Sequence, residues 1–143
     1  MTDTRRLLSE LQRTSALLAA AVDVRLQRET GLPLVLFEPM SVIAGRNACR
    51  VYDLATDLGV SSGGASKLVD RLEARGYCRR RPNPGDRRSS LLELTPAGTA
   101  LLATAERSVD LGLNDLLGSR LSKAEVTALT ALLHELRTTV RPE

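Results

Sequence analysis

The sequence predicts a mainly α-helical fold with one small β-hairpin. Apolar residues recur at helical spacing over most of the 143-residue chain. Aromatic residues make up only 2% of it, so leucine, alanine and valine must fill the core, which suits helices. One short segment instead contains strand-like runs on either side of a Pro-Asn-Pro-Gly-Asp turn. The length fits one domain with a moderate core.

The first predicted helix covers residues 3–29. Its apolar residues form one stripe, which includes Leu7, Leu11 and Leu18. Glycine and then proline follow, at Gly31 and Pro33, in the order that commonly ends a helix. A second helix is predicted to begin close to Pro39, because the first turn is where a proline's missing N–H does no harm.

Two short helices joined by a glycine-containing turn come next. The first is predicted at residues 52–58, and the second starts from a cap at Ser61 or Ser62 and runs to about Arg75. The inward positions of the second helix follow the spacing i, i+3, i+4, i+7, which gives it one buried face. The pair is predicted to be a helix-turn-helix.

A basic hairpin and two further helices complete the predicted fold. The strands are expected at residues 77–81 and 89–94, and leucines at positions 91, 92 and 94 anchor the second strand. Thr95 caps and Pro96 opens a helix that runs to about Leu117. A Ser122–Glu125 capping box starts the last helix. Its apolar face includes Leu129, Leu133 and Leu136.

Positive charge is concentrated in the middle third of the chain. Residues 46–88 contain ten basic and five acidic side chains, a net charge of +5, whereas the remainder carries −2. Eighteen of the 20 basic residues are arginine. A compositional bias of the genome explains arginine in place of lysine, but it does not explain the clustering. A concentrated basic patch predicts a polyanionic partner.

A helix-turn-helix followed by a basic hairpin is the pattern of a winged helix-turn-helix, and it predicts how the chain would contact DNA. The second helix of the pair fits the major groove, and wing arginines reach the minor groove or the phosphates. Asp86 is expected to hold an arginine in position through a bidentate pair. The predicted DNA-contacting residues are Ser61, Ser62, Gly63, Gly64, Ser66, Lys67, Arg71, Arg79, Arg81, Asp86, Arg87 and Arg88.

The stretch from Asp53 to Gly98 closely resembles the MarR family of multiple-antibiotic-resistance-type transcriptional regulators. The family's Asp-x-Arg wing motif corresponds to Asp86 and Arg88, and its Leu-Thr-x-x-Gly motif corresponds to residues 94–98. The run LVDRLEARG resembles the end of the family's recognition helix. This match covers about a third of the chain, and the flanking helices fit the family only by pattern.

The resemblance implies a homodimer that binds a pseudo-palindromic double-stranded operator, usually as a repressor. A small aromatic or anionic effector would bind between the dimer region and the DNA-binding lobe and release the DNA. The implied segments are an N-terminal dimerisation helix at 1–33, a DNA-binding lobe at 34–95 and C-terminal dimerisation helices at 96–143. The family's usual early aromatic residue in helix 2 corresponds to Met40, and its usual Ser or Thr after the short strand corresponds to Tyr52. Both departures leave the ligand's chemistry open. The expected dimerisation residues are Leu7, Leu11, Leu18, Leu129, Leu133 and Leu136.

Other functions find less support in the sequence. No nucleophile–base set, no glycine-rich phosphate loop and no metal-ligand spacing around His134 is present, so we expect no enzyme, no metal and no cofactor. Two alternatives remain: a redox-responsive regulator acting through Cys49 or Cys78, and a winged helix that binds proteins. Without a signal-peptide pattern or a membrane-length apolar run, the expected location is the cytoplasm, in association with the nucleoid.

Overall fold

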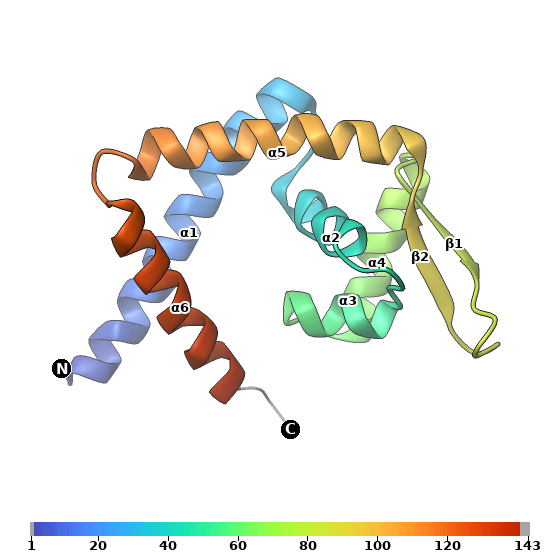
Figure 1. The fold of residues 1–143 in the computed structure, drawn as a ribbon, viewed down its shortest axis with the longest axis horizontal. Helices are drawn as coiled ribbons and strands as arrows, with labels where there is room; N and C mark the ends of the chain where they lie inside the picture. Colours follow the sequence, from blue (N-terminus) through green and yellow to red (C-terminus); the bar gives the residue numbers. More distant parts are fainter. Residues whose placement is uncertain (1, 141–143) are drawn as a thin grey trace. The chain divides into compact units, whose positions relative to one another are not determined.

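The computed structural model describes residues 2–140 and divides the chain into two compact units, Met1–Val109 and Asp110–Glu143. Helices account for most of the described residues, and one antiparallel hairpin is present, which confirms the predicted fold class (Figure 1). The outer ends of the predicted dimerisation segments, Met1 and residues 141–143, lie outside the described residues. The elements in chain order are α1 (Asp3–Thr30), α2 (Leu34–Ala44), α3 (Val51–Leu58), α4 (Ser62–Ala74), β1 (Cys78–Pro82), β2 (Ser90–Leu94), α5 (Pro96–Leu117) and α6 (Lys123–Thr139).

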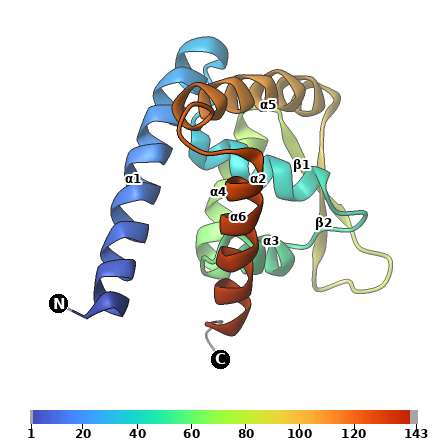
Figure 2. The ribbon, with the colours of Figure 1, turned by 60° about the vertical axis from the view of Figure 1, so that its left-hand side comes forward.

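Helices α2, α3 and α4 pack on one another beside the hairpin, and both views of the ribbon show this group (Figures 1 and 2). Their shared core contains Leu36, Leu54 and Leu72, all fully buried. Burial of each such side chain contributes roughly 1.5–3 kcal/mol. The chain turns between α3 and α4 at Gly59, whose φ of 69° is one that a glycine adopts without strain. These helices form the predicted helix-turn-helix.

The hairpin pairs β1 with β2 in an antiparallel register that runs from Cys78 opposite Leu94 to Pro82 opposite Ser90. A single bridge adds a third chain segment, because the N–H of Leu92 donates to the Cys49 carbonyl at 2.7 Å. Leu92 and its neighbour Leu91 are buried, so the returning strand is fastened to the lobe as predicted. The tip between the strands projects away from this anchor.

The predicted start of the second helix is wrong. Helix α2 begins at Leu34, after Pro33, and Pro39 lies buried in its interior. The side chain that caps this helix comes from α1, where Asp23 Oδ1 accepts the Leu34 N–H at 2.8 Å. The missing N–H of Pro39 deprives the Val35 carbonyl of its helical donor. Val35 lies on the exposed side of α2, where solvent can replace that donor.

The second unit consists of the end of α5 and all of α6. A capping box starts α6 as predicted, with Ser122 Oγ accepting the Glu125 N–H and Glu125 Oε1 accepting the Ser122 N–H, both at 3.1 Å. Yet none of its residues is buried. Its apolar side chains are therefore left uncovered within the described chain. The exposed ones are Val126, Leu129, Leu132, Leu133 and Leu136.

No helix within residues 2–140 combines the length and the apolar character that crossing a membrane requires.

Candidate nucleic-acid interface

Helix α4 presents the polar face that the sequence predicts. Ser61 is the cap, because its Oγ accepts the Gly64 N–H at 3.0 Å. The helix buries Ala65, Val69 and Leu72 against the lobe. Of the predicted contact residues around this helix, Ser61, Ser62, Gly63, Lys67 and Arg71 are exposed, and Gly64 and Ser66 are half-buried.

The glycine at position 63 is not required by the protein's own packing. A Cβ added there would meet nothing within 4 Å. Glycine within a helix costs about 1 kcal/mol relative to alanine. A residue that weakens the helix and relieves no internal contact is suited to the close approach of another molecule. Gly63 therefore leaves the backbone at the start of α4 open to the approach of another molecule.

One arginine joins the hairpin to α4. The Arg80 side chain is 27% exposed, and its Nη1 lies 2.9 Å from Asp70 Oδ1 and also pairs with Glu73. Its Nη2 donates to the Ser66 carbonyl at 3.3 Å and to the Ser66 hydroxyl at 3.2 Å. These bonds fix the hairpin relative to the helix. Arg80 is not among the predicted DNA-contacting residues, although strand alternation places it on the face opposite Arg79 and Arg81.

The outer face of the hairpin carries Arg79 and Arg81, which share one carboxylate. Arg79 Nε lies 2.5 Å from Glu93 Oε1, and Arg81 Nε lies 3.0 Å from Glu93 Oε2. Both arginines are exposed. The three side chains together carry one net positive charge, so their attraction for phosphate is weaker than that of two free arginines.

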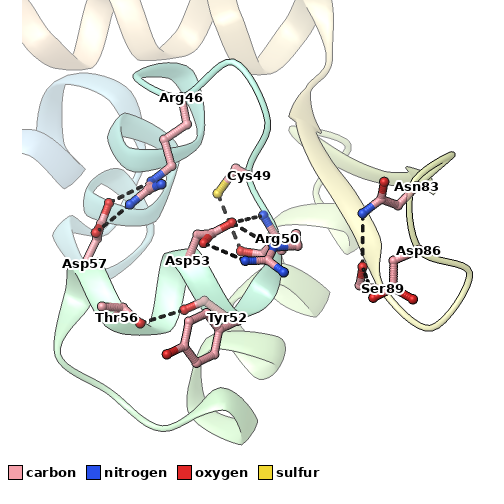
Figure 3. A network of polar contacts seen from close by, with 10 residues as sticks. All are labelled: Arg46, Cys49, Arg50, Tyr52, Asp53, Thr56, Asp57, Asn83, Asp86 and Ser89. Atoms are coloured by element: carbon pink, nitrogen blue, oxygen red, sulfur yellow. Dashed lines mark hydrogen bonds and ion pairs between the residues drawn. The ribbon is translucent and has the colours of Figure 1, made fainter.

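Asp86 organises the tip of the wing in a way that the sequence analysis did not foresee. The predicted bidentate pair with an arginine is wrong. Asp86 Oδ1 accepts the backbone N–H of Arg88 at 2.9 Å, and Oδ2 accepts the Ser89 hydroxyl at 3.4 Å. Asn83 Nδ2 donates to the same hydroxyl at 3.1 Å, so Ser89 ties the two sides of the tip together (Figure 3). An aspartate side chain is short, so in a turn its carboxylate readily accepts the backbone N–H two residues further along the chain and is less able to reach the guanidinium at the end of a long arginine side chain.

The two arginines at the tip are free to meet an anion. Arg87 and Arg88 are both exposed. Among residues 2–140, no carboxylate lies within ion-pair distance of either guanidinium. Asp86 fixes the backbone of Arg88 while leaving its charge uncompensated. The wing therefore presents an uncompensated guanidinium on a fixed backbone, as is required of a side chain that enters a narrow, electronegative minor groove.

The Leu-Thr-x-x-Gly motif locks the base of the wing to α5. The Thr95 N–H donates to the Tyr77 carbonyl at 3.0 Å, and the Thr95 hydroxyl donates to the Gly76 carbonyl at 2.6 Å. The same hydroxyl accepts the Gly98 N–H at 3.1 Å and so caps α5, as predicted. A Cβ at Gly98 would lie 2.1 Å from the Tyr77 carbonyl oxygen. Only glycine fits there.

Both cysteines are poorly suited to sensing oxidants. Cys49 and Cys78 are buried, with 0% and 3% of their surface exposed. Burial, reinforced by Asp53, raises the pKa of the Cys49 thiol to about 11. Burial, reinforced by Glu73, raises the pKa of the Cys78 thiol to about 11. Because the thiolate is the reactive form, both residues are inert at neutral pH. The redox alternative therefore loses support.

The described residues, 2–140, hold no cluster of three or more metal-ligating side chains. His134 lies 3.3 Å from an arginine, Arg137, through its Nδ1.

A helix-turn-helix whose second helix is bonded to an arginine-rich hairpin defines the class of winged helix-turn-helix proteins. Comparison with known proteins narrows the class. The MarR family model matches residues 34–90, the segment from α2 to the wing. The multiple antibiotic resistance protein MarR of Salmonella typhimurium is 33% identical over 84 residues, 59% of this chain. That match covers 58% of the relative's own length.

Solved structures agree along the whole chain. Sco3205, a MarR family transcriptional regulator from Streptomyces coelicolor solved in complex with DNA, superposes with a TM-score of 0.87 at 23% identity, covering 100% of this chain and 95% of that one. BpsR of Bordetella bronchiseptica, whose DNA binding is regulated by 6-hydroxynicotinic acid, gives a TM-score of 0.79 at 23% identity, covering 92% and 98%. Residues 34–90 of the chain therefore match the MarR family, and the fold of the whole chain is the one that MarR family regulators have.

Proposed function

We propose that the protein is a transcriptional repressor that binds a pseudo-palindromic DNA operator as a homodimer and is released by a small effector. One observation carries the proposal: Arg80 bonds the exposed helix α4 to a wing whose tip arginines have no acidic partner among residues 2–140. The two DNA-probing elements are thus held as one rigid surface. DNA complexes of a structural relative, Sco3205, support the choice of partner.

Within this proposal, α4 reads bases and the wing supplies affinity. The exposed Lys67 and Arg71 would reach base edges or phosphates from the major groove, and Arg87 and Arg88 would enter or flank the minor groove. Two copies related by a twofold axis would place their recognition helices roughly 34–36 Å apart, one helical turn of DNA.

The exposed apolar faces support the homodimer. Leu129, Leu133 and Leu136 of α6 are 46%, 40% and 42% exposed. Leu7 and Leu17 of α1 are 52% and 73% exposed. Apolar stripes left open on two long helices are the usual mark of an interface between copies. Of the other leucines expected in this interface, Leu11 and Leu18 are half-buried already.

Release by an effector draws support from a cavity and from BpsR. A cavity of about 260 Å³ lies between α1 and α2, next to the residues that the sequence analysis assigned to dimerisation. Its walls are mainly apolar, and Asp23 supplies the one carboxylate. A carboxylate disfavours an anion, so we propose a neutral aromatic effector for this protein, in contrast to the acid that regulates BpsR. A regulator that acts on DNA in this way works in the cytoplasm, in association with the nucleoid.

The decisive experiment is selection of bound duplexes from a random library, followed by titration of the selected duplex. We expect an enriched inverted repeat and an affinity that falls steeply with salt. Arg88→Ala should weaken binding by roughly tenfold or more, because a charge-assisted contact contributes about 1.5–3 kcal/mol. Arg107→Ala is the matched control, since it removes an exposed arginine from α5 outside this surface. No enriched sequence, or equal effects of the two substitutions, would defeat the proposal.

A further inference from the structure

A second basic feature lies beside the wing, and of the residues that line it only Arg88 is among those that the sequence predicts to contact DNA. A cavity of about 280 Å³ opens between the start of α3 and the returning side of the hairpin. Figure 3 shows its two sides, with Arg50 and Tyr52 at the start of α3 and Ser89 on the wing. Arg80, Arg88 and Ser90 complete the polar lining, which includes no acidic residue.

The cavity is lined by three arginines whose charges are compensated to different degrees. Arg80 is neutralised by Asp70 and Glu73 on α4. Arg50 lies 3.2 Å from Asp53 Oδ2 through its Nε, and its side chain remains 45% exposed. Arg88 has no acidic partner among residues 2–140. Two exposed guanidinium groups thus face one cavity, and only one of them is paired with a carboxylate.

The neighbouring groups favour an anion in this cavity. The Ser89 and Ser90 hydroxyls can donate hydrogen bonds from the hairpin side. Asp53 is occupied on the α3 side, because its Oδ2 also accepts the Arg50 N–H at 3.0 Å. Tyr52, 66% exposed, holds its ring 5.8 Å from the Arg50 guanidinium carbon and provides an apolar wall.

The position of the cavity, between α4 and the tip of the wing, indicates which anion it would bind. On one side of the cavity, Arg80 is hydrogen-bonded to α4, and on the other side Arg88 belongs to the tip of the wing. A protein that places α4 in a major groove and the wing in the adjacent minor groove must straddle the sugar–phosphate strand that separates the two grooves. We propose that this cavity seats one phosphate of that strand, held by Arg50 and Arg88, with the Tyr52 ring against the adjoining sugar.

This inference rests on the proposed function and adds a contact that sets register without reading sequence. Arg50→Ala should weaken binding of the selected operator and of an unrelated duplex by the same factor, roughly tenfold. It should also lower the slope of log affinity against log salt by about 1.

Arg46→Ala is the matched control. It removes the same charge as Arg50→Ala and breaks a comparable ion pair, because Arg46 Nη2 lies 2.9 Å from Oδ1 of Asp57, which is on α3 like Asp53. Arg46 does not line the cavity. We expect it to change affinity and salt slope far less than Arg50→Ala. Thermal melts of the two variants verify that both are folded. Equal effects of the two substitutions would reduce the role of Arg50 to net charge and overturn the proposal.

Neutral methylphosphonates placed singly along the operator locate the phosphate. One position between the wing and recognition-helix contacts should weaken wild-type binding by a larger factor than it weakens Arg50→Ala binding, in which only Arg88 still holds the phosphate. If no such position exists, or if Arg50→Ala binds and responds to salt like wild type, the phosphate seat is refuted while DNA binding stands. If wild type binds no duplex, the proposed function fails first.

Discussion

Replacing Gly98 by alanine should destabilise the protein through a single backbone contact. The added Cβ would lie 2.1 Å from the Tyr77 carbonyl oxygen and 2.9 Å from the Tyr77 carbonyl carbon. Ordinary contact distances are about 3.5–4.0 Å, so α5 and the base of β1 must separate by more than an ångström. That shift also strains the hydrogen bond from the Thr95 N–H to the same carbonyl.

The magnitude follows from two opposing effects. Overpacking of this kind costs about 1–3 kcal/mol, and a lost hydrogen bond costs about 0.5–1.5 kcal/mol. The better helix propensity of alanine returns up to about 1 kcal/mol. Gly98→Ala should therefore lower the free energy of unfolding by about 1–3 kcal/mol in urea titrations at fixed protein concentration. Gly63→Ala is the control, because its Cβ meets nothing within 4 Å, and it should stabilise slightly. Equal stability of the Gly98 variant and wild type would refute the steric argument.

Three further outcomes are expected. Cys49 and Cys78 should resist a thiol-specific disulfide reagent at neutral pH in the folded protein and react at once in urea, because burial keeps both thiols protonated; fast reaction when folded would contradict their burial. Leu133→Asp should turn dimers into monomers in sedimentation experiments and weaken operator binding; a persistent dimer would remove α6 from the interface. Ser122→Ala should fray α6 and raise the pKa of Glu125 part of the way to its usual value, because the hydrogen bond from the Ser122 backbone, the larger cause of the lowered pKa, remains and only the contribution of the hydroxyl is lost. The stabilising effect of that carboxylate is present above its unfolded pKa and is lost as pH falls through its lowered pKa, so an unchanged Glu125 titration by NMR would count against the capping box.

Elements built from local signals could be predicted from the sequence. Helix α4 follows from the spacing of its apolar residues and a serine cap, and the wing follows from its turn residues. The start of α2 could not be predicted in this way. The group that caps it, Asp23, is eleven residues before Leu34 in the chain and reaches it only once α1 and α2 have packed.

The candidate site shows the same limit. Exposure of Lys67 and Arg71 follows from helical periodicity, but the partners of the wing arginines depend on which strand face each occupies. The alternation of side chains along β1 places Arg80 on the opposite face from Arg79 and Arg81. The carboxylates that form ion pairs with Arg80, however, lie on another element, α4. The role of Asp86 depends on turn geometry, and a count of charges suggested a different partner.

The hydrogen bond from the Leu34 N–H to Asp23 makes one amide a reporter on the position of α1. Exchange of that amide with solvent requires the carboxylate of a neighbouring helix to move away, because no residue of α2 itself protects it. An effector that displaces α1 would accelerate deuterium uptake at Leu34. Deuterium uptake at Leu34 with and without an effector would then show whether the effector moves α1.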